Sequence, residues 1–168
     1  MRNERDFRDF LICFNKYRVN YCIIGGFSVI YHSRPRFTND MDILIKPSSG
    51  NSKKVYKAMK DFGADVSNID PDYFIAPGHF YQIGVPPVQI HILNFADGVD
   101  MDKVFKNKIK AQYANIRAYY IALNDVIKNK QSSGRNKDKL DVEALKLAKE
   151  KSKKSSKNRK RGQSPFSI

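Results

Sequence analysis

The sequence is poor in cysteine. Its 168 residues include two, Cys13 and Cys22, and both lie in apolar segments. Two cysteines are too few for the disulfide framework that holds many small secreted domains together. We therefore expect both thiols to be reduced and to lie in the core.

Long hydrophobic runs are also missing. No apolar stretch approaches the roughly 20 residues that span a bilayer, and the N-terminal Met1-Arg-Asn-Glu-Arg-Asp has no signal-peptide core. The sequence therefore predicts a cytoplasmic protein without a membrane segment. Hydrophobic residues still make up 41% of the chain, which excludes disorder over its whole length and suits one globular domain.

Acidic residues are scarce relative to basic ones, with 17 Asp and Glu against 31 Lys and Arg and a net charge of +14. Half of the excess lies in residues 149–168, where eight basic side chains face only Glu150. This Lys- and Ser-rich segment has no apolar period and predicts a disordered basic tail. A polyanion, most simply RNA or tRNA, is the partner that such charge favours. A solvated tail that only keeps the protein soluble is the alternative.

A glycine pair punctuates the N-terminal part of the chain. Residues 21–24 are apolar and predict a short core strand that ends at Gly25-Gly26, where a short helix through Tyr31 begins. Residues 40–45 then alternate as a second strand. We expect one face to carry Met41, Ile43 and Ile45, and the other Asp40, Asp42 and Leu44.

This pattern has a chemical use. Two carboxylates one pleat apart, Asp40 and Asp42, can converge on a hard divalent cation whose other ligands are phosphate oxygens and water. Glycines before a helix N-terminus let a phosphate approach backbone N–H groups, and Ser28 adds a hydroxyl. Each feature alone is common for structural reasons, as a solvated strand edge or a plain turn. Together, in this order, they predict a triphosphate cradle beside a metal site.

These residues resemble the signature of the nucleotidyltransferase superfamily, which has a DNA polymerase β-like fold. The spacing of Arg36, Thr38, Asp40 and Asp42 is most similar to the AbiEii-type branch, which includes toxins of toxin–antitoxin pairs. The resemblance implies an α+β fold in which helices pack on a mixed sheet. It also implies Mg²⁺ or Mn²⁺ on Asp40 and Asp42, and an NTP whose terminal phosphates meet Gly25, Gly26 and Ser28, with Arg36 and Thr38 beside them.

The strand expected at residues 88–93 departs from that family pattern. A third carboxylate of the superfamily commonly holds the catalytic metal and accepts the proton of the acceptor hydroxyl, but the matching position here is His91. Neutral imidazole, with a reference pKa of roughly 6.5, can serve as a base but is a poor ligand for Mg²⁺. A purely structural histidine is the alternative.

A second part of the resemblance lies near the C-terminus, in the pattern formed by Lys130, Arg135, Lys137, Asp138 and Asp141. It implies that Lys130 meets the triphosphate and that Asp138 or Asp141 orients it or the acceptor. The alternative is a helix-start acid favoured by the helix dipole, with ordinary surface salt bridges.

The remaining elements follow from periodicity and from cap residues. We expect helices over 6–17, 51–62, 124–132 and 136–148, and one from Asp100 or Met101 to Lys108, with Asn51 and Asn124 as N-caps and Gly63 and Gly134 as stops. Further strands are expected over 64–66, 80–83, 111–113 and 116–120. The last helix would bury Leu140, Ala144, Leu145 and Ala148. Residues 1–148 would form the domain, with its core in 20–95 and a helical part in 122–148.

The sequence thus predicts a metal-dependent nucleotidyltransferase that transfers a nucleoside monophosphate from an NTP to a hydroxyl of RNA, tRNA or a protein. It would act alone or as a toxin–antitoxin component with an antitoxin-like protein partner. The alternative is a catalytically impaired member of the fold that binds RNA or a partner. His91 favours this alternative, whereas the intact pair Asp40 and Asp42 opposes it.

Overall fold

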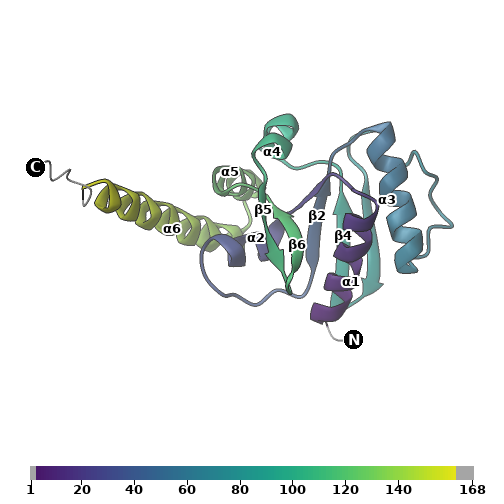
Figure 1. Ribbon diagram of the computed structural model, residues 1–168, viewed down its shortest axis with the longest axis horizontal. Helices are drawn as coiled ribbons and strands as arrows, with labels where there is room; N and C mark the ends of the chain where they lie inside the picture. The colour runs from purple at the N-terminus through teal and green to yellow at the C-terminus, as the bar shows by residue number, and fades with distance from the viewer. Residues whose placement is uncertain (1–2, 162–168) are drawn as a thin grey trace, which may run out of the picture.

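The computed structural model describes the backbone of residues 3–161 and the side-chain surroundings of residues 4–155. The described residues form six helices and one six-stranded sheet with the strand order β3-β4-β2-β1-β6-β5 (Figure 1). The strands are β1 (Tyr21–Ile23), β2 (Met41–Ile45), β3 (Phe80–Val85), β4 (Val88–Leu93), β5 (Ile109–Tyr113) and β6 (Ile116–Tyr120). The helices are α1 (Asn3–Lys16), α2 (Gly25–His32), α3 (Ser49–Phe62), α4 (Met101–Asn107), α5 (Leu123–Ser133) and α6 (Asn136–Arg161).

The sheet is mixed, as predicted for an α+β fold. β2 runs parallel to β4 and antiparallel to β1, while β1 runs parallel to β6. β3 and β5 pair antiparallel with β4 and β6, and close the two edges. In the β2–β4 register Asp42 lies directly opposite His91, so two residues 49 positions apart in the chain become neighbours on one face.

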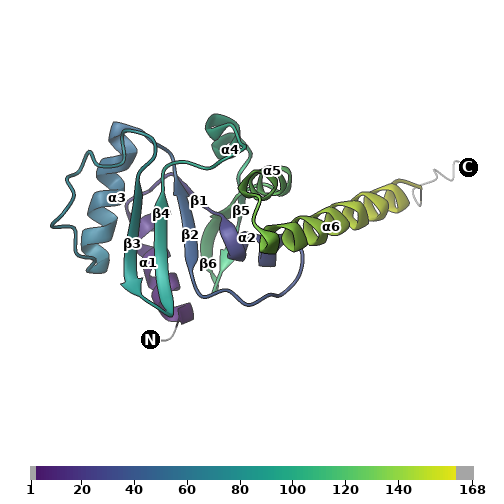
Figure 2. The same cartoon turned by 180° about the vertical axis from the view of Figure 1, so that it is seen from behind.

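Helices cover both faces of the sheet (Figures 1 and 2). One core cluster joins α1 and α3 to Met41, Ile43 and Ile45 of β2. The other joins α2, α4, α5 and the start of α6 to Leu44 of β2 and to Cys22 of β1. The predicted alternation of residues 40–45 is therefore confirmed, and Asp42 emerges on the face of the second cluster.

Several predicted caps are wrong. Ser48, not Asn51, caps α3 by accepting a hydrogen bond from the Asn51 backbone N–H. Asn51 instead lies buried, where its side chain bonds the main chain of Asn20 and Lys46. Helix α5 begins after Ala122 without a side-chain cap, so Asn124 does not have the predicted role.

The predicted ends of two helices are confirmed, and one predicted strand is wrong. Gly63 and Gly134 follow α3 and α5 with the positive φ values that favour glycine. Residues 64–66 form no strand, since the described sheet passes from β2 directly to β3 in sequence. Cys13 and Cys22 are free thiols, Cys22 fully buried and Cys13 partly so.

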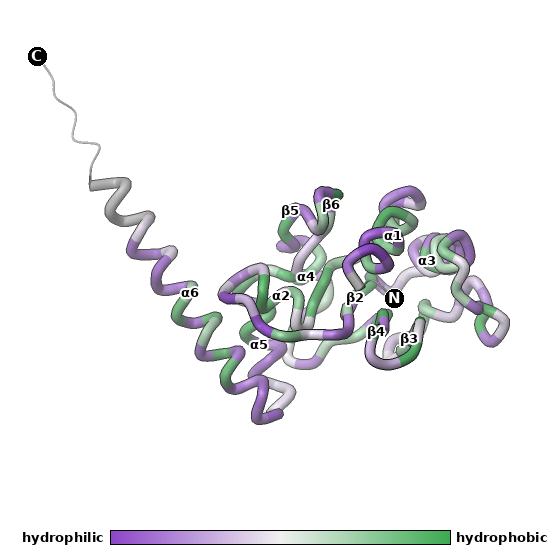
Figure 3. Tube along the Cα trace, turned by 90° about the horizontal axis from the view of Figure 1, so that it is seen from below, coloured by the Kyte–Doolittle hydropathy of each residue, from purple (hydrophilic) through white to green (hydrophobic). Residues whose placement is uncertain are grey.

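Helix α6 corrects the prediction of a disordered segment from residue 149. It continues to Arg161 and projects from the domain (Figures 1 and 2), with hydrophilic residues recurring along the projecting part (Figure 3). Residues 136–161 contain no glycine or proline, and lysine, alanine and leucine favour helix even without packing. The expectation for residues 162–168 lies outside the described residues.

The buried face of α6 also differs from the predicted one. Leu145 is fully buried as expected, whereas Leu140 is 59% exposed and Ala144 and Ala148 are half-buried. The other side chains that α6 buries are Asp138, Asp141 and Val142. No helix in the described part of the chain is long and apolar enough to cross a membrane.

Candidate active site

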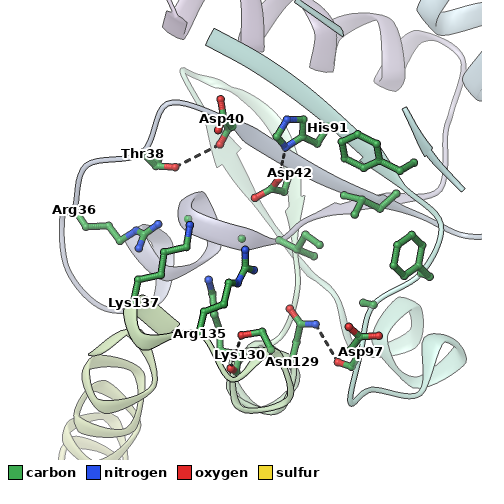
Figure 4. Close-up of a pocket in the computed structure, with 18 residues that line it drawn as sticks. Arg36, Thr38, Asp40, Asp42, His91, Asp97, Asn129, Lys130, Arg135 and Lys137 are labelled. Carbon is green, nitrogen blue, oxygen red and sulfur yellow. Dashed lines mark hydrogen bonds and ion pairs between the residues drawn. The ribbon is translucent and has the colours of Figure 1, made fainter. Parts of the chain in front are cut away.

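A cavity of about 420 Å³ opens where the β1–α2 turn, β2, β4 and the α5–α6 connection meet (Figure 4). Most of the residues predicted to form a site line this cavity: Gly25, Gly26, Arg36, Thr38, Asp40, Asp42, His91 and Lys130. Residues from four separate stretches of sequence therefore converge on one space. Ser28, Asp138 and Asp141 do not line it.

Asp42 is held between a histidine and a glycine. Its Oδ1 lies 2.9 Å from Nδ1 of His91. Gly25 has a φ of +62°, and a Cβ built there would lie 1.9 Å from Asp42 Oδ2. Any other residue at position 25 would therefore displace the carboxylate, so this glycine serves close approach as well as turn geometry.

The second glycine makes room for the loop that precedes β2. A Cβ on Gly26 would lie 2.5 Å from Oγ1 of Thr38 and 2.9 Å from a guanidinium nitrogen of Arg36. Thr38 Oγ1 donates a hydrogen bond of 3.4 Å to the carbonyl of Asp40. The glycine pair thus lets the loop cross close above the start of α2, and places Arg36 and Thr38 at the cavity.

The Asp42–His91 hydrogen bond determines how His91 can act. An ionised carboxylate only accepts, so Nδ1 carries a proton, and in the neutral ring Nε2 is then the nitrogen with the lone pair. The hydrogen bond to Asp42 raises the pKa of His91 and outweighs burial, which lowers it. The structure therefore pairs His91 with one of the two aspartates instead of supplying a third carboxylate.

Asp40 and Asp42 suit a hard divalent cation. Both line the cavity, and Mg²⁺ is commonly held by one or two carboxylates together with substrate phosphates. Within the described residues no group of three or more His, Cys, Asp and Glu side chains is placed to hold a metal ion by itself. The donor set therefore fits a cation shared with a phosphate ligand, not one enclosed by protein.

Lys130 is the centre of a buried ion-pair network. Its Nζ lies 2.6 Å from Asp138 Oδ1 and 3.2 Å from Asp141 Oδ2, and its side chain is only 7% exposed. Asp141 also accepts hydrogen bonds of 3.0 and 3.1 Å from Nη1 of Arg36. The network ties the loop before β2 to α5 and α6 across 105 positions of sequence.

Asp138 is likewise occupied by protein groups. Arg135 Nε donates to its Oδ2 at 3.0 Å, and the Ser133 hydroxyl bonds the same oxygen. Burial raises the pKa of Asp138, but the hydrogen bonds from Lys130 and Ser133 outweigh burial, so the net pKa is lowered. Asp138 and Asp141 thus hold cations in place, where the prediction had them facing the nucleotide or acceptor.

Ser28 also differs from its predicted role. Its hydroxyl donates to the carbonyl of Gly25 at 2.8 Å, and the residue is fully buried. The side chain closes the first turn of α2 from the inside. The backbone of the turn, but not this hydroxyl, faces the cavity.

Some lining residues were not identified as site residues from the sequence. Arg135 and Lys137 bring two more cations from the α5–α6 connection (Figure 4). Both lie within the C-terminal pattern, which could have identified them. Asn129, which donates a hydrogen bond to the carbonyl of Asp97, and the rings of Phe80 and Phe95 also line the cavity. Nothing in the sequence distinguishes Asn129, Phe80 and Phe95 from ordinary surface residues.

The fold and this site together define the class of protein. The chain belongs to the family described as nucleotidyltransferase of unknown function (DUF6036), whose model matches residues 9–158. Membership confirms the superfamily that the glycine turn and Asp40-x-Asp42 indicate. It does not distinguish the AbiEii-type branch, which stays a prediction.

A solved structure supports the same fold. The crystal structure of the lincosamide antibiotic adenylyltransferase LnuA, lincomycin-bound, matches with a TM-score of 0.58 and 14% sequence identity. The match covers 84% of this chain and 95% of that chain. At this identity the similarity shows the nucleotidyltransferase fold alone. No curated protein matches the chain closely enough to count as a relative.

Proposed function

We propose that this protein transfers a nucleoside monophosphate from an NTP to a hydroxyl acceptor and releases pyrophosphate. The observation that carries the proposal is Asp42 in the cavity, held between His91 and the Gly25 turn, with Asp40 just before β2 lining the same space. Cationic side chains of Arg36, Arg135 and Lys137 line the same space. Carboxylates for a metal on one side and cations on the other suit a triphosphate.

The chain's own residues would bind and orient the nucleotide. The backbone N–H groups at the start of α2 would face the phosphates, while the space beside Gly25 and Gly26 holds the side chains of Asp42, Thr38 and Arg36. Arg135 and Lys137 stabilise the charge that develops on the leaving pyrophosphate. Phe80 and Phe95, 45% and 36% exposed, offer flat apolar surfaces for the base.

A divalent cation would be held by Asp40 and Asp42. Mg²⁺ or Mn²⁺ bound there supplies charge neutralisation to the phosphate oxygens. Asp42 Oδ1 accepts from His91, and Oδ2, which lies toward Gly25, is the oxygen that remains available. Asp40 presents its carboxylate without an ion pair to any described residue.

His91 would act as general base. Nε2 accepts the proton of the acceptor hydroxyl while the oxygen attacks the α-phosphorus. The new P–O bond forms as the bond to the β-phosphate bridging oxygen breaks, and pyrophosphate leaves with the electron pair. Asp42 keeps the imidazole in the required tautomer and stabilises it when it is protonated.

For the acceptor we propose RNA or tRNA. The first turn of α6 lies at the cavity, through Lys137, and the helix then carries further lysines outward (Figure 1). A polyanion with its reacting hydroxyl in the cavity can lie along this helix. A protein side chain as acceptor is the alternative.

The predicted toxin role rests only on the resemblance to AbiEii-type proteins. If the chain is a toxin, its induction in cells stops growth, and the arrest is lost with Asp42→Ala. An antitoxin-like partner then restores growth. Unimpeded growth on induction of the wild-type chain argues against this role but leaves the chemistry untouched.

The test of the activity is transfer of label from each α-labelled NTP to total cellular RNA, with Mg²⁺ and separately with Mn²⁺. Wild type is compared with Asp42→Ala and His91→Asp. We expect label that depends on Asp42, and its position identifies the nucleotide and the acceptor class.

Two other outcomes carry different conclusions. If the wild type transfers no label but His91→Asp does, histidine disables the site, and the protein binds RNA or a partner instead. If none of the three proteins transfers label to RNA, and none does so to cellular protein, the proposal is overturned.

A further inference from the structure

A second cavity lies at the other end of β1 from the candidate active site. Asn20 precedes β1 and lines this cavity, whereas Ile24 and Gly25 follow β1 and line the first. The second cavity measures about 360 Å³. Its lining residues, all in the described part of the chain, differ from those of the first, so a ligand in it would contact a separate set of side chains.

The charged side chains that line the second cavity are all basic. Arg18, Lys108 and Arg117 line it, and its lining contains no carboxylate. None of the three forms an ion pair with any described residue. Elsewhere in the molecule the buried Lys130 is compensated, since Asp138 and Asp141 lie within 3.2 Å of it, whereas Lys108 is half-buried. Lys108 has no such partner among the residues that the structure describes.

Lys108 is held in a defined position. Its Nζ donates to Oδ1 of Asn20 at 2.6 Å and to the carbonyl of Tyr21 at 3.2 Å. It also lies 4.3 Å from the centre of the Tyr119 ring. Burial lowers the pKa of Lys108, and no carboxylate offsets this. An ammonium group has three N–H donors, so one remains for a ligand.

The backbone at the two arginines has a defined conformation. Asn15, in the last turn of α1, donates a hydrogen bond of 2.7 Å to the carbonyl of Arg117 in β6. Arg18 follows α1 with a φ of +53°, a conformation in which glycine is the usual residue. Local backbone energy therefore does not favour arginine at position 18, whereas its charge adds to that of Lys108 and Arg117.

We propose that this second cavity binds a phosphate group. Guanidinium and ammonium groups without internal partners are the typical ligands of phosphate oxygens in proteins. The source of the group is either the phosphodiester backbone of a nucleic acid or a small free phosphate. The proposal does not depend on the proposed nucleotidyl transfer, because the residues of the two cavities are separate.

The test compares two variants of the full chain that lose the same charge. Arg18→Gly with Arg117→Gln removes both guanidinium groups, and glycine suits the positive φ at position 18. The control, Lys54→Gln with Lys57→Gln, removes two exposed lysines of α3. Amide NMR resonances are followed in a titration with inorganic phosphate.

We expect phosphate to shift the amides of Asn20, Lys108 and Tyr119 in wild type and control. Binding at these amides should be about tenfold weaker or more in the arginine variant. Equal affinity in all three proteins, or an equal loss in both variants, overturns the proposal. An unshifted wild type overturns it as well.

A second arm distinguishes the sources. Binding of a labelled single-stranded RNA is measured against salt concentration. If the site takes a nucleic-acid backbone, the negative slope of log K against log salt becomes shallower by about 0.7 in the arginine variant, for the one phosphate that the cavity no longer neutralises. If the arginine variant keeps the salt slope of the wild type although its binding of inorganic phosphate is weakened, the ligand is a small free phosphate.

Discussion

At the scale of single residues, the candidate site depends on two glycines whose missing side chains leave room for other residues that line the cavity. Asp42 occupies the space beside Gly25, while Thr38 and Arg36 occupy the space beside Gly26. The turn therefore does more than reverse the chain. It is the surface against which the functional side chains of β2 and of the preceding loop are positioned.

Gly25→Ala should damage both activity and stability. The positive φ costs about 1–3 kcal/mol in unfolding free energy for a residue with a Cβ. The methyl group also displaces the Asp42 carboxylate, and a shift on the order of 1 Å can reduce the rate ~100-fold. Urea denaturation and the label-transfer assay measure the two effects.

Gly50→Ala is the matched control. Gly50 lies in the first turn of α3, and a Cβ there would have nothing within 4 Å. Alanine favours helix, so we expect this variant to gain about 0.5 kcal/mol and to keep its activity. Equal behaviour of the two variants would show that the space beside Gly25 is unimportant.

At the scale of elements, the described side chains that α6 buries lie no further along the helix than Leu145. Asp138 and Asp141 enter the ion-pair network with Lys130 and Arg36, and Val142 and Leu145 enter the second core cluster. Beyond them the helix projects from the domain (Figure 1). The same short segment thus anchors the helix and positions the cations of the candidate active site.

Leu145→Ala should weaken this anchorage. Leu145 is fully buried, and truncation of a buried leucine costs about 2–5 kcal/mol of unfolding free energy. Leu147→Ala is the control on the same helix, since Leu147 is 59% exposed and its truncation should change stability by at most about 0.5 kcal/mol. Urea unfolding followed by circular dichroism measures both. Similar losses of stability would mean that α6 packs through a different face.

At the scale of the whole molecule, the charge is divided between the domain and the end of the chain. Removing residues 149–168 takes away +7 of the net +14. Neither core cluster contains a residue from this segment among those described. The positive charge of this segment and the stability of the domain can therefore be changed independently.

Deletion of residues 149–168 should leave the urea midpoint unchanged and weaken RNA binding. The salt slope should fall by about 0.7 for each RNA phosphate that the shortened chain no longer neutralises. RNA retention as a function of salt measures this, with the full chain as reference. If retention is unchanged, the basic end of the chain has no part in RNA binding and the domain itself must bind the phosphates.

The sequence by itself determined the features that depend on neighbouring residues. Alternation over residues 40–45 predicted which side chains of β2 enter the core, because successive residues of a strand point to opposite faces. Gly63 and Gly134 predicted two helix ends through their backbone preference. The glycine turn with Asp40-x-Asp42 was enough to indicate the nucleotidyltransferase superfamily.

Only the tertiary structure decided which side chains meet. His91 pairs with Asp42 because β2 and β4 are parallel neighbours in a register that brings them level. Asp138 and Asp141 form ion pairs with Lys130 and Arg36 because α5, α6 and the loop before β2 converge there. A local sequence pattern determines backbone conformation and the face of a strand on which a side chain lies. The partner of a charged group depends instead on the order of the strands and on contacts between distant segments.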